Sequence, residues 1–167
     1  MKQSVRMGVG VAAAAVSCLI SSVALAGIAD SPLPVLLAGK KTIHLYSVPL
    51  VVRYGGVGTF FACTSTDTVT MQVGVEGFPF FGGGPSNDAG ADSRSVDPGA
   101  TVIFATGPAA GIPVDSTLPF VSRGSARILA TSKKLVCNVF MADVINAPPA
   151  SMAQLTIIAK VKQKAAN

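Results

Sequence analysis

The chain has 167 residues, of which 50% are hydrophobic and only 13% charged, and its formal net charge at pH 7 is +5. These values exclude a disordered segment, which is poor in apolar residues, and a coiled coil, which needs many charged helix formers. The 17 Gly and 11 Pro follow no period, which excludes collagen, and the length indicates a single domain.

The first 26 residues have the three parts of a secretory signal peptide. Lys2 and Arg6 give a positive start, residues 7–20 are mostly apolar, and residues 24–26, Ala-Leu-Ala, form a small-x-small cleavage site. The mature chain would begin at Gly27 and would be secreted or periplasmic. The loss of Lys2 and Arg6 would lower the formal net charge from +5 to +3.

Two alternatives for this segment stay open. Residues 7–26 could remain as an uncleaved membrane anchor. Cys18 could instead carry a lipid, although the three residues before it match the usual leucine-led motif only in part. No later stretch is long and apolar enough to span a membrane, so we expect no membrane span after signal cleavage.

Residues 27–41 contain Pro32, Pro34 and Gly39 and predict an irregular lead-in or linker. Its apolar residues are expected to pack on the edge of the domain: Leu33, Val35, Leu36 and Leu37. The chain is therefore divided into the signal peptide (1–26), this lead-in (27–41), a β-sandwich domain (42–164) and a tail (165–167).

Period-two alternation of apolar and polar residues begins after Thr42. Residues 69–76 predict a half-buried strand with its apolar face inward and its polar face in water, and residues 155–162 predict a second one. Further strands are expected at residues 43–54, 57–65, 101–106, 125–131 and 135–144. No convincing helix of ten or more residues follows the signal peptide.

Turn residues separate the expected strands. In the run Asp97-Pro98-Gly99, Pro98 presets one turn angle and Gly99 can take a positive φ. The remaining Gly and Pro clusters fall between the same strands. This pattern predicts a chain of short strands rather than a few long elements.

Cys18 would leave with the signal peptide, so the mature chain would keep Cys63 and Cys137. In an oxidising compartment two cysteines in a small domain predict a disulfide. Two buried free thiols and a metal pair are the alternatives. A metal pair is disfavoured because two Cys and one His fall short of a four-ligand zinc site.

Short strands and one long-range cysteine pair predict an all-β fold, an immunoglobulin-like antiparallel β-sandwich with one disulfide. Cys63 lies near the end of one expected strand and Cys137 inside another, and we expect their bridge to join the two sheets. The chain has no Trp beside this pair. The analogy with immunoglobulin domains is therefore architectural and implies no function.

Residues 82–99 form the one long loop that the pattern predicts. This loop contains Asn87, Asp88, Asp92 and Asp97, whose oxygens could bind an ion such as calcium or another ligand. The spacing lacks the glycine and the terminal glutamate of the helix–loop–helix calcium pattern. We expect a solvated connector, with a ligand or ion site as the alternative.

The sequence offers little for catalysis. His44 is the only histidine, no Gly-x-Ser-x-Gly motif is present, and Glu76 is the only Glu. A Ser-His-Asp triad therefore rests on one His, which we expect to be structural, and a blue-copper site is excluded because it needs two His. We expect no enzymatic activity, no catalytic residue, no resident metal and no cofactor.

Two segments could form contact surfaces. Phe78, Phe80 and Phe81 stand just before the long loop and would form either an exposed apolar patch or a plug for the core, which we favour. Lys160, Lys162 and Lys164 follow one face of the last expected strand. They could bind an anionic surface, but we expect them to block edge-to-edge strand pairing.

We therefore predict a secreted, non-enzymatic β-sandwich protein with a structural or binding role outside the cytoplasm. The alternative is an extracytoplasmic module that binds an ion, a glycan or a protein through residues 82–99. The partner is unknown, with another surface protein or a cell-envelope polymer as candidates. Nucleic acid is not expected, because the basic residues are scattered.

Overall fold

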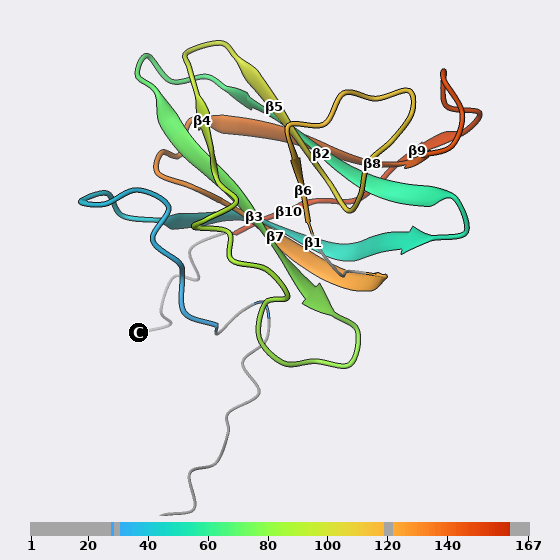
Figure 1. Ribbon diagram of the computed structural model, residues 1–167. Coiled ribbons are helices and arrows are strands. Elements are labelled where there is room, and N and C mark those ends of the chain that lie inside the picture. The colour runs from blue at the N-terminus through green and yellow to red at the C-terminus, as the bar shows by residue number, and fades with distance from the viewer. Residues whose placement is uncertain (1–27, 29–30, 119–121, 161–167) are drawn as a thin grey trace, which may run out of the picture.

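The computed structural model describes residues 28, 31–118 and 122–160, so the predicted signal peptide lies outside the described residues. This part of the chain is all-β, as predicted, and contains no helix (Figure 1). Its ten strands are β1 (Ile43–Tyr54), β2 (Val57–Ser65), β3 (Met71–Pro79), β4 (Arg94–Val96), β5 (Thr101–Ala105), β6 (Ser116–Thr117), β7 (Arg123–Ala130), β8 (Leu135–Asp143), β9 (Met152–Gln154) and β10 (Ile158–Ala159).

The strands form one continuous sheet that folds over on itself and nearly closes into a barrel (Figure 1). One half contains β4, β3, β7, β1 and β10, and the other contains β6, β5, β2, β8 and β9. The two halves join where Arg53 and Tyr54 of β1 pair with Gly58 and Val57 of β2. All pairs are antiparallel except β5 with β6, which makes the sheet mixed.

A single large hydrophobic cluster fills the space between the two halves. Val48 of β1, Val73 of β3 and Ile128 of β7 face Phe61 of β2 and Val139 of β8 in this cluster. Alternation along each strand sends these side chains inward, and their burial supplies the main favourable free energy of folding.

The described residues include no helix long and apolar enough to cross a membrane.

The strand predictions are confirmed closely for five elements. β1 and β2 have the expected ends, and β5, β7 and β8 differ from the expected ranges by at most two residues at either end. The strand expected at residues 69–76 is displaced and runs from Met71 to Pro79. Its inner face is apolar as predicted, but Glu76 on the outer face is buried rather than exposed to water.

The prediction of a single strand at residues 155–162 is wrong in its described part. β9 pairs with β8 and β10 pairs with β1, with an unpaired stretch between them. The amide of Leu155 still donates to the Val139 carbonyl (2.8 Å), whereas that of Lys160 donates to the Leu45 carbonyl (2.9 Å). The segment therefore crosses from one half of the sheet to the other, so it cannot pair along its whole length with a single neighbouring strand. Lys162 and Lys164 lie outside the described residues.

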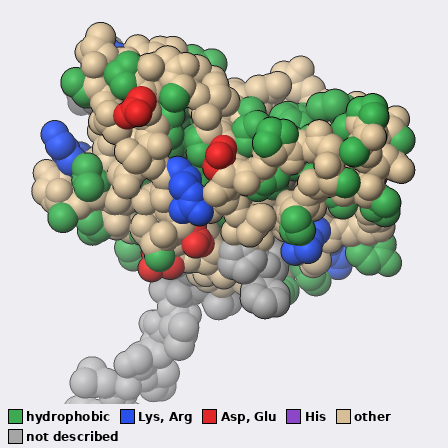
Figure 2. All heavy atoms as spheres, turned by 45° about the horizontal axis from the view of Figure 1, so that its top comes forward, with side chains coloured by type: hydrophobic (Ala, Val, Ile, Leu, Met, Phe, Trp, Pro, Cys, Tyr) green, Lys and Arg blue, Asp and Glu red, His purple; other side chains and the backbone are tan. Residues whose placement is uncertain are grey.

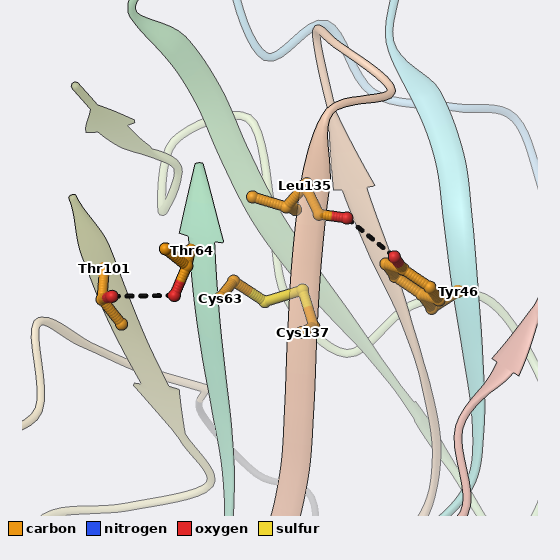
Figure 3. The surroundings of a disulfide bond; sticks show 6 residues. All are labelled: Tyr46, Cys63, Thr64, Thr101, Leu135 and Cys137. Atoms are coloured by element: carbon orange, nitrogen blue, oxygen red, sulfur yellow. Dashed lines mark hydrogen bonds between the residues drawn. A yellow bond between two sulfur atoms is a disulfide. The ribbon is translucent and has the colours of Figure 1, made fainter. Parts of the chain in front are cut away.

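The predicted disulfide between Cys63 and Cys137 is confirmed, but its predicted place is wrong. The two residues are direct partners on neighbouring strands β2 and β8, with Cα atoms 4.1 Å apart (Figure 3). The bridge therefore lies within one half of the sheet and does not join the two layers. Near it, the two halves are linked by Tyr46 of β1, whose hydroxyl donates to the Leu135 carbonyl of β8 (2.7 Å) (Figure 3).

The predicted loop at residues 82–99 is not one continuous loop, because it contains the short strand β4. β4 pairs with the first residues of β3, from Met71 to Val73. The turn after it has the predicted form: the Ala100 amide donates to the Asp97 carbonyl (3.0 Å), and Gly99 has φ of 76°. A proline followed by a glycine with positive φ is typical of this tight turn.

Candidate functional site

The predicted loop residue Asn87 extends the edge of β3 where β4 no longer pairs with it. Its Oδ1 accepts from the Gly77 amide (2.9 Å) and its Nδ2 donates to the Val75 carbonyl (2.8 Å). The side-chain amide thus takes the place of a neighbouring strand's backbone. Both polar groups of Asn87 are occupied by this structural role.

The three aspartates of the same segment serve separate local purposes. Asp88 Oδ1 accepts from the Gly90 amide (2.9 Å), and Asp97 Oδ1 accepts from the Thr70 hydroxyl (2.7 Å). Asp92 contributes its backbone carbonyl, which accepts from the Ser116 hydroxyl (3.3 Å). Among the residues that the structure describes, no three His, Cys, Asp or Glu are grouped so that they could hold a metal ion.

His44 lies on β1 and is only 7% exposed. Its Nε2 lies within hydrogen-bond distance of the Tyr46 carbonyl (3.1 Å) and the Ser47 hydroxyl (3.0 Å), while Nδ1 faces the Lys160 ammonium (3.4 Å). The pKa of His44 is lowered to about 4, first by burial and then by the charges of Lys160 and Arg127, while the hydrogen bond to the Tyr46 carbonyl partly opposes this fall. A catalytic triad needs a carboxylate where this ring meets an ammonium group.

The structure shows a buried ion pair that sequence reasoning missed. Arg127 of β7 is 1% exposed, and its Nε donates to the carboxylate of Glu76 on β3, which is 2% exposed. The two residues are direct cross-strand partners. Burial raises the pKa of the Glu76 carboxyl, with a smaller contribution from Asp88, whereas Arg127 opposes this rise. Alternation shows that both side chains point outward, but not what covers them.

The cover is the lead-in. Arg127 Nη1 donates to the Ser31 carbonyl (2.9 Å), and Nη2 donates to the Pro32 carbonyl (2.8 Å). Farther along, Leu36 packs on Leu129 of β7 and on Ala89 of the long loop. Residues 31–41 therefore pack against the outer face of the sheet as an irregular lead-in.

Close packing of this layer explains why β3 carries a glycine at position 74. A Cβ on Gly74 would lie 2.9 Å from both the Ala89 carbonyl oxygen and a methyl group of Leu36. Of the four apolar lead-in residues expected to pack on the domain, only Leu36 is buried. The others are exposed: Leu33, Val35 and Leu37.

The aromatic segment at the end of β3 is only partly buried. Phe78 is 3% exposed and lies beside Arg127 on the outer face of the sheet, whereas Phe80 and Phe81 are 57% and 77% exposed. The plug prediction is therefore wrong for these two residues. The register of β3 with β7 ends at Pro79 and Gly124, and the amide of Phe80 makes a last hydrogen bond to the Arg123 carbonyl (3.2 Å), so β7 offers no further partner beyond this point.

Beside Phe80 lies an open groove of about 420 Å³, which we call the aromatic groove. It lies between the bulge of β1 and the adjoining ends of β3 and β7, and its lining residues include Ile28, Pro49, Leu50, Phe80, Gly82 and Arg123. Leu50 is exposed because the β1–β7 register shifts between Val48 and Val51, and such bulges redirect side chains. The Arg123 guanidinium lies 3.8 Å from the centre of the Phe80 ring.

A second open groove, of about 510 Å³, lies along residues 108–114. It is formed almost entirely by one loop and has no charged side chain in its lining. Ile112 and Val114 of this loop pack on a small cluster with Phe60 and Ala142 on the outer side of the other half. The loop thus mainly shields that face, whereas the aromatic groove combines aromatic, aliphatic and cationic groups.

No protein-family model, no curated protein and no solved structure matches this chain. The function is therefore inferred from the chain's own residues. The aromatic groove is the candidate site, since it combines the exposed ring of Phe80, an aliphatic wall and a cation.

Proposed function

We propose that the chain is a non-enzymatic protein that acts outside the cytoplasm by binding a partner through the aromatic groove. One observation carries the proposal: Phe80 and Phe81 are 57% and 77% exposed, although large apolar side chains are normally buried. An exposed apolar surface next to a groove is typical of an interaction site. Gly82 and Gly83 also line the groove, so the start of the predicted binding loop contributes to it.

The proposed location rests on two features of the chain. Residues 1–26 have the pattern of a cleavable signal peptide. The disulfide between Cys63 and Cys137 is of the kind that persists in oxidising compartments. We retain an immunoglobulin-like sandwich as the interpretation of the architecture, although this bridge joins neighbouring strands and no Trp lies beside it.

A binding role is favoured over catalysis because the chemically useful side chains have structural partners. Glu76 is paired with Arg127, and His44 is held between the Tyr46 carbonyl and Lys160. On the face drawn in Figure 2, charged side chains are few and form no extended patch of one sign. An apolar recognition surface fits this composition better than a highly charged one.

The surface can be tested with an anionic apolar dye, 1-anilinonaphthalene-8-sulfonate, added to the folded protein. We expect saturable fluorescence enhancement that the Phe80→Ser, Phe81→Ser double variant loses while its melting temperature is unchanged. Tyr54→Ser is the matched control, because Tyr54 is 81% exposed at the β1–β2 turn, away from the groove. Equal enhancement by the double variant and the wild type would refute the groove as the binding surface.

The proposed location is tested separately. N-terminal sequencing of protein recovered from the periplasm or medium should begin at Gly27. Recovery of the chain only from the cytoplasm, with residues 1–26 attached, would contradict an extracytoplasmic function.

A further inference from the structure

Two arginines lie on the outer face of β7, four positions apart, and each faces a phenylalanine in or just after β3. Arg127 lies 5.2 Å from the ring centre of Phe78, and Arg123 lies 3.8 Å from that of Phe80. Because side chains alternate along a strand, Arg123 and Arg127 point to the same side. The two positions therefore repeat one arrangement, once under the lead-in and once at the aromatic groove.

The covered position shows what satisfies an arginine at this place. Arg127 receives one carboxylate, from Glu76, and three backbone carbonyls from an irregular stretch of chain, at Ile28, Ser31 and Pro32. A guanidinium has five N–H donors in a planar fork, so a carboxylate together with carbonyls uses most of them. The partner of Arg127 is in effect an acidic side chain plus a piece of polypeptide backbone.

The open position lacks these partners among the described residues. Arg123 is exposed, and its side chain forms no ion pair with any carboxylate that the structure describes. One face of its guanidinium covers Phe80, which leaves the edge with the N–H donors available. Beside it, Leu50 and Pro49 provide an aliphatic wall.

We propose that the aromatic groove binds a segment of a partner protein that carries a carboxylate next to apolar side chains. The carboxylate would bind Arg123, and the apolar side chains would lie against Leu50 and Phe80. The partner's backbone would lie beside Arg123 in the way that the lead-in backbone lies beside Arg127. This inference rests on the proposed function and names the class of its partner.

A polypeptide fits the groove better than a small molecule or a bilayer. Small-molecule sites usually enclose most of the ligand, whereas this groove is open along its length. Ile28 of the lead-in already lines the groove, so the groove already accommodates one residue of an irregular polypeptide segment. A bilayer would require a broader apolar face than the few side chains present here.

The binding experiment uses fluorescence anisotropy with short labelled peptides that alternate leucine with glutamate, glutamine or lysine. We expect the glutamate peptide to bind the wild-type chain about five- to tenfold more tightly than the glutamine peptide, as for a partly desolvated charge pair. Arg123→Gln should remove this preference, and Arg123→Glu should make the lysine peptide the tightest binder. Lys133→Gln, which removes one exposed charge near the β7–β8 turn, is the matched control.

Several outcomes would overturn the partner class. Equal affinity for the three peptides, or no binding of any, would do so, and the dye experiment would then show separately whether the groove is a binding surface. Binding to neutral or anionic phospholipid vesicles that requires Phe80 and Phe81 would point to a membrane instead. Concentration-dependent dimerisation abolished by the same two substitutions would point to a second copy of the chain.

Asp30, an acidic residue of the chain itself, is replaced as a control for competition with the peptide. It is the one of the chain's eight Asp and Glu residues that lies outside the described part, two positions after Ile28. We expect Asp30→Asn to leave the affinity for the glutamate peptide unchanged. If that affinity appears only in the Asp30→Asn variant, Arg123 already has an internal partner and the proposal is overturned.

Discussion

Arg127 and Arg123 differ in their surroundings far more than in their positions on β7. Arg127 is 1% exposed and is surrounded by Glu76 and the carbonyls of the lead-in, whereas Arg123 is exposed and lies only over Phe80. The strand places both on one face, so the difference comes from the lead-in, which covers one and not the other. The same residue type is therefore a structural element at one position and a candidate binding group at the other.

The largest effect is expected when the covered arginine is replaced. Arg127→Met leaves the Glu76 carboxylate and the lead-in carbonyls without their donor, so it should reduce the free energy of unfolding by about 3–5 kcal/mol. Arg123→Met should change that free energy by less than about 0.5 kcal/mol, because the side chain is exposed. Urea titrations of the two variants measure both values.

The covered pair can be examined further with a double substitution. Arg127→Met combined with Glu76→Leu should recover part of the lost stability, because no buried charge is then left unpaired. A double variant as unstable as the sum of the two single variants would show that Glu76 and Arg127 are not coupled. Equal losses for Arg127→Met and Arg123→Met would refute the contrast between the two sites.

The disulfide gives a reference for stability in the other half of the sheet, away from both arginines. Cys63 and Cys137 are 74 positions apart. Replacement of both by alanine should lower the free energy of unfolding by about 2–5 kcal/mol, the usual range for a small domain of this kind. Non-reducing peptide mapping should show the bridge in the wild-type protein, and two freely alkylated thiols would contradict it.

The comparison of the two arginines also shows what the sequence could and could not reveal. Alternation and glycine turns located β1 and β2 because those signals are local. Glu76 and Arg127 are 51 positions apart, and alternation indicates only that each leaves the core. The exposure of Phe80 could not be predicted either, since it depends on where the pairing of β3 with β7 ends.

The pKa of His44 shows whether β1 is shielded from water in the same way as β7 is around Arg127. Since the pKa of His44 falls to about 4 in the folded state from 6.5, the unfolded chain binds more protons between these values. Its contribution to stability is therefore complete above pH 6.5 and is lost as the pH falls towards 4. For a shift of this size we expect about 3 kcal/mol over this range.

The measurement is the difference in unfolding free energy between the wild type and His44→Gln at several pH values. The difference is needed because other carboxyl groups titrate in the same experiment. Glu76, with its raised pKa, has the opposite slope, whereas Asp67 and Asp143, with pKa values of about 2, act mainly below pH 4. A wild-type-minus-variant difference that does not depend on pH would show that His44, unlike Arg127, is not shielded from water.

The smallest effect is expected for calcium, which tests the acidic segment at residues 82–99. Asp88 accepts a backbone hydrogen bond within its own turn, while the carboxylate of Asp97 accepts from Thr70, and neither is grouped with other acidic ligands in the described part of the chain. Millimolar calcium should therefore leave the melting temperature unchanged, because a ligand stabilises a fold only when it binds the folded state. The Asp88→Ala, Asp92→Ala double variant should respond to calcium as the wild type does. A calcium-dependent rise that this double variant loses would restore the ion-binding alternative for residues 82–99 and would place a second ligand site beside the aromatic groove.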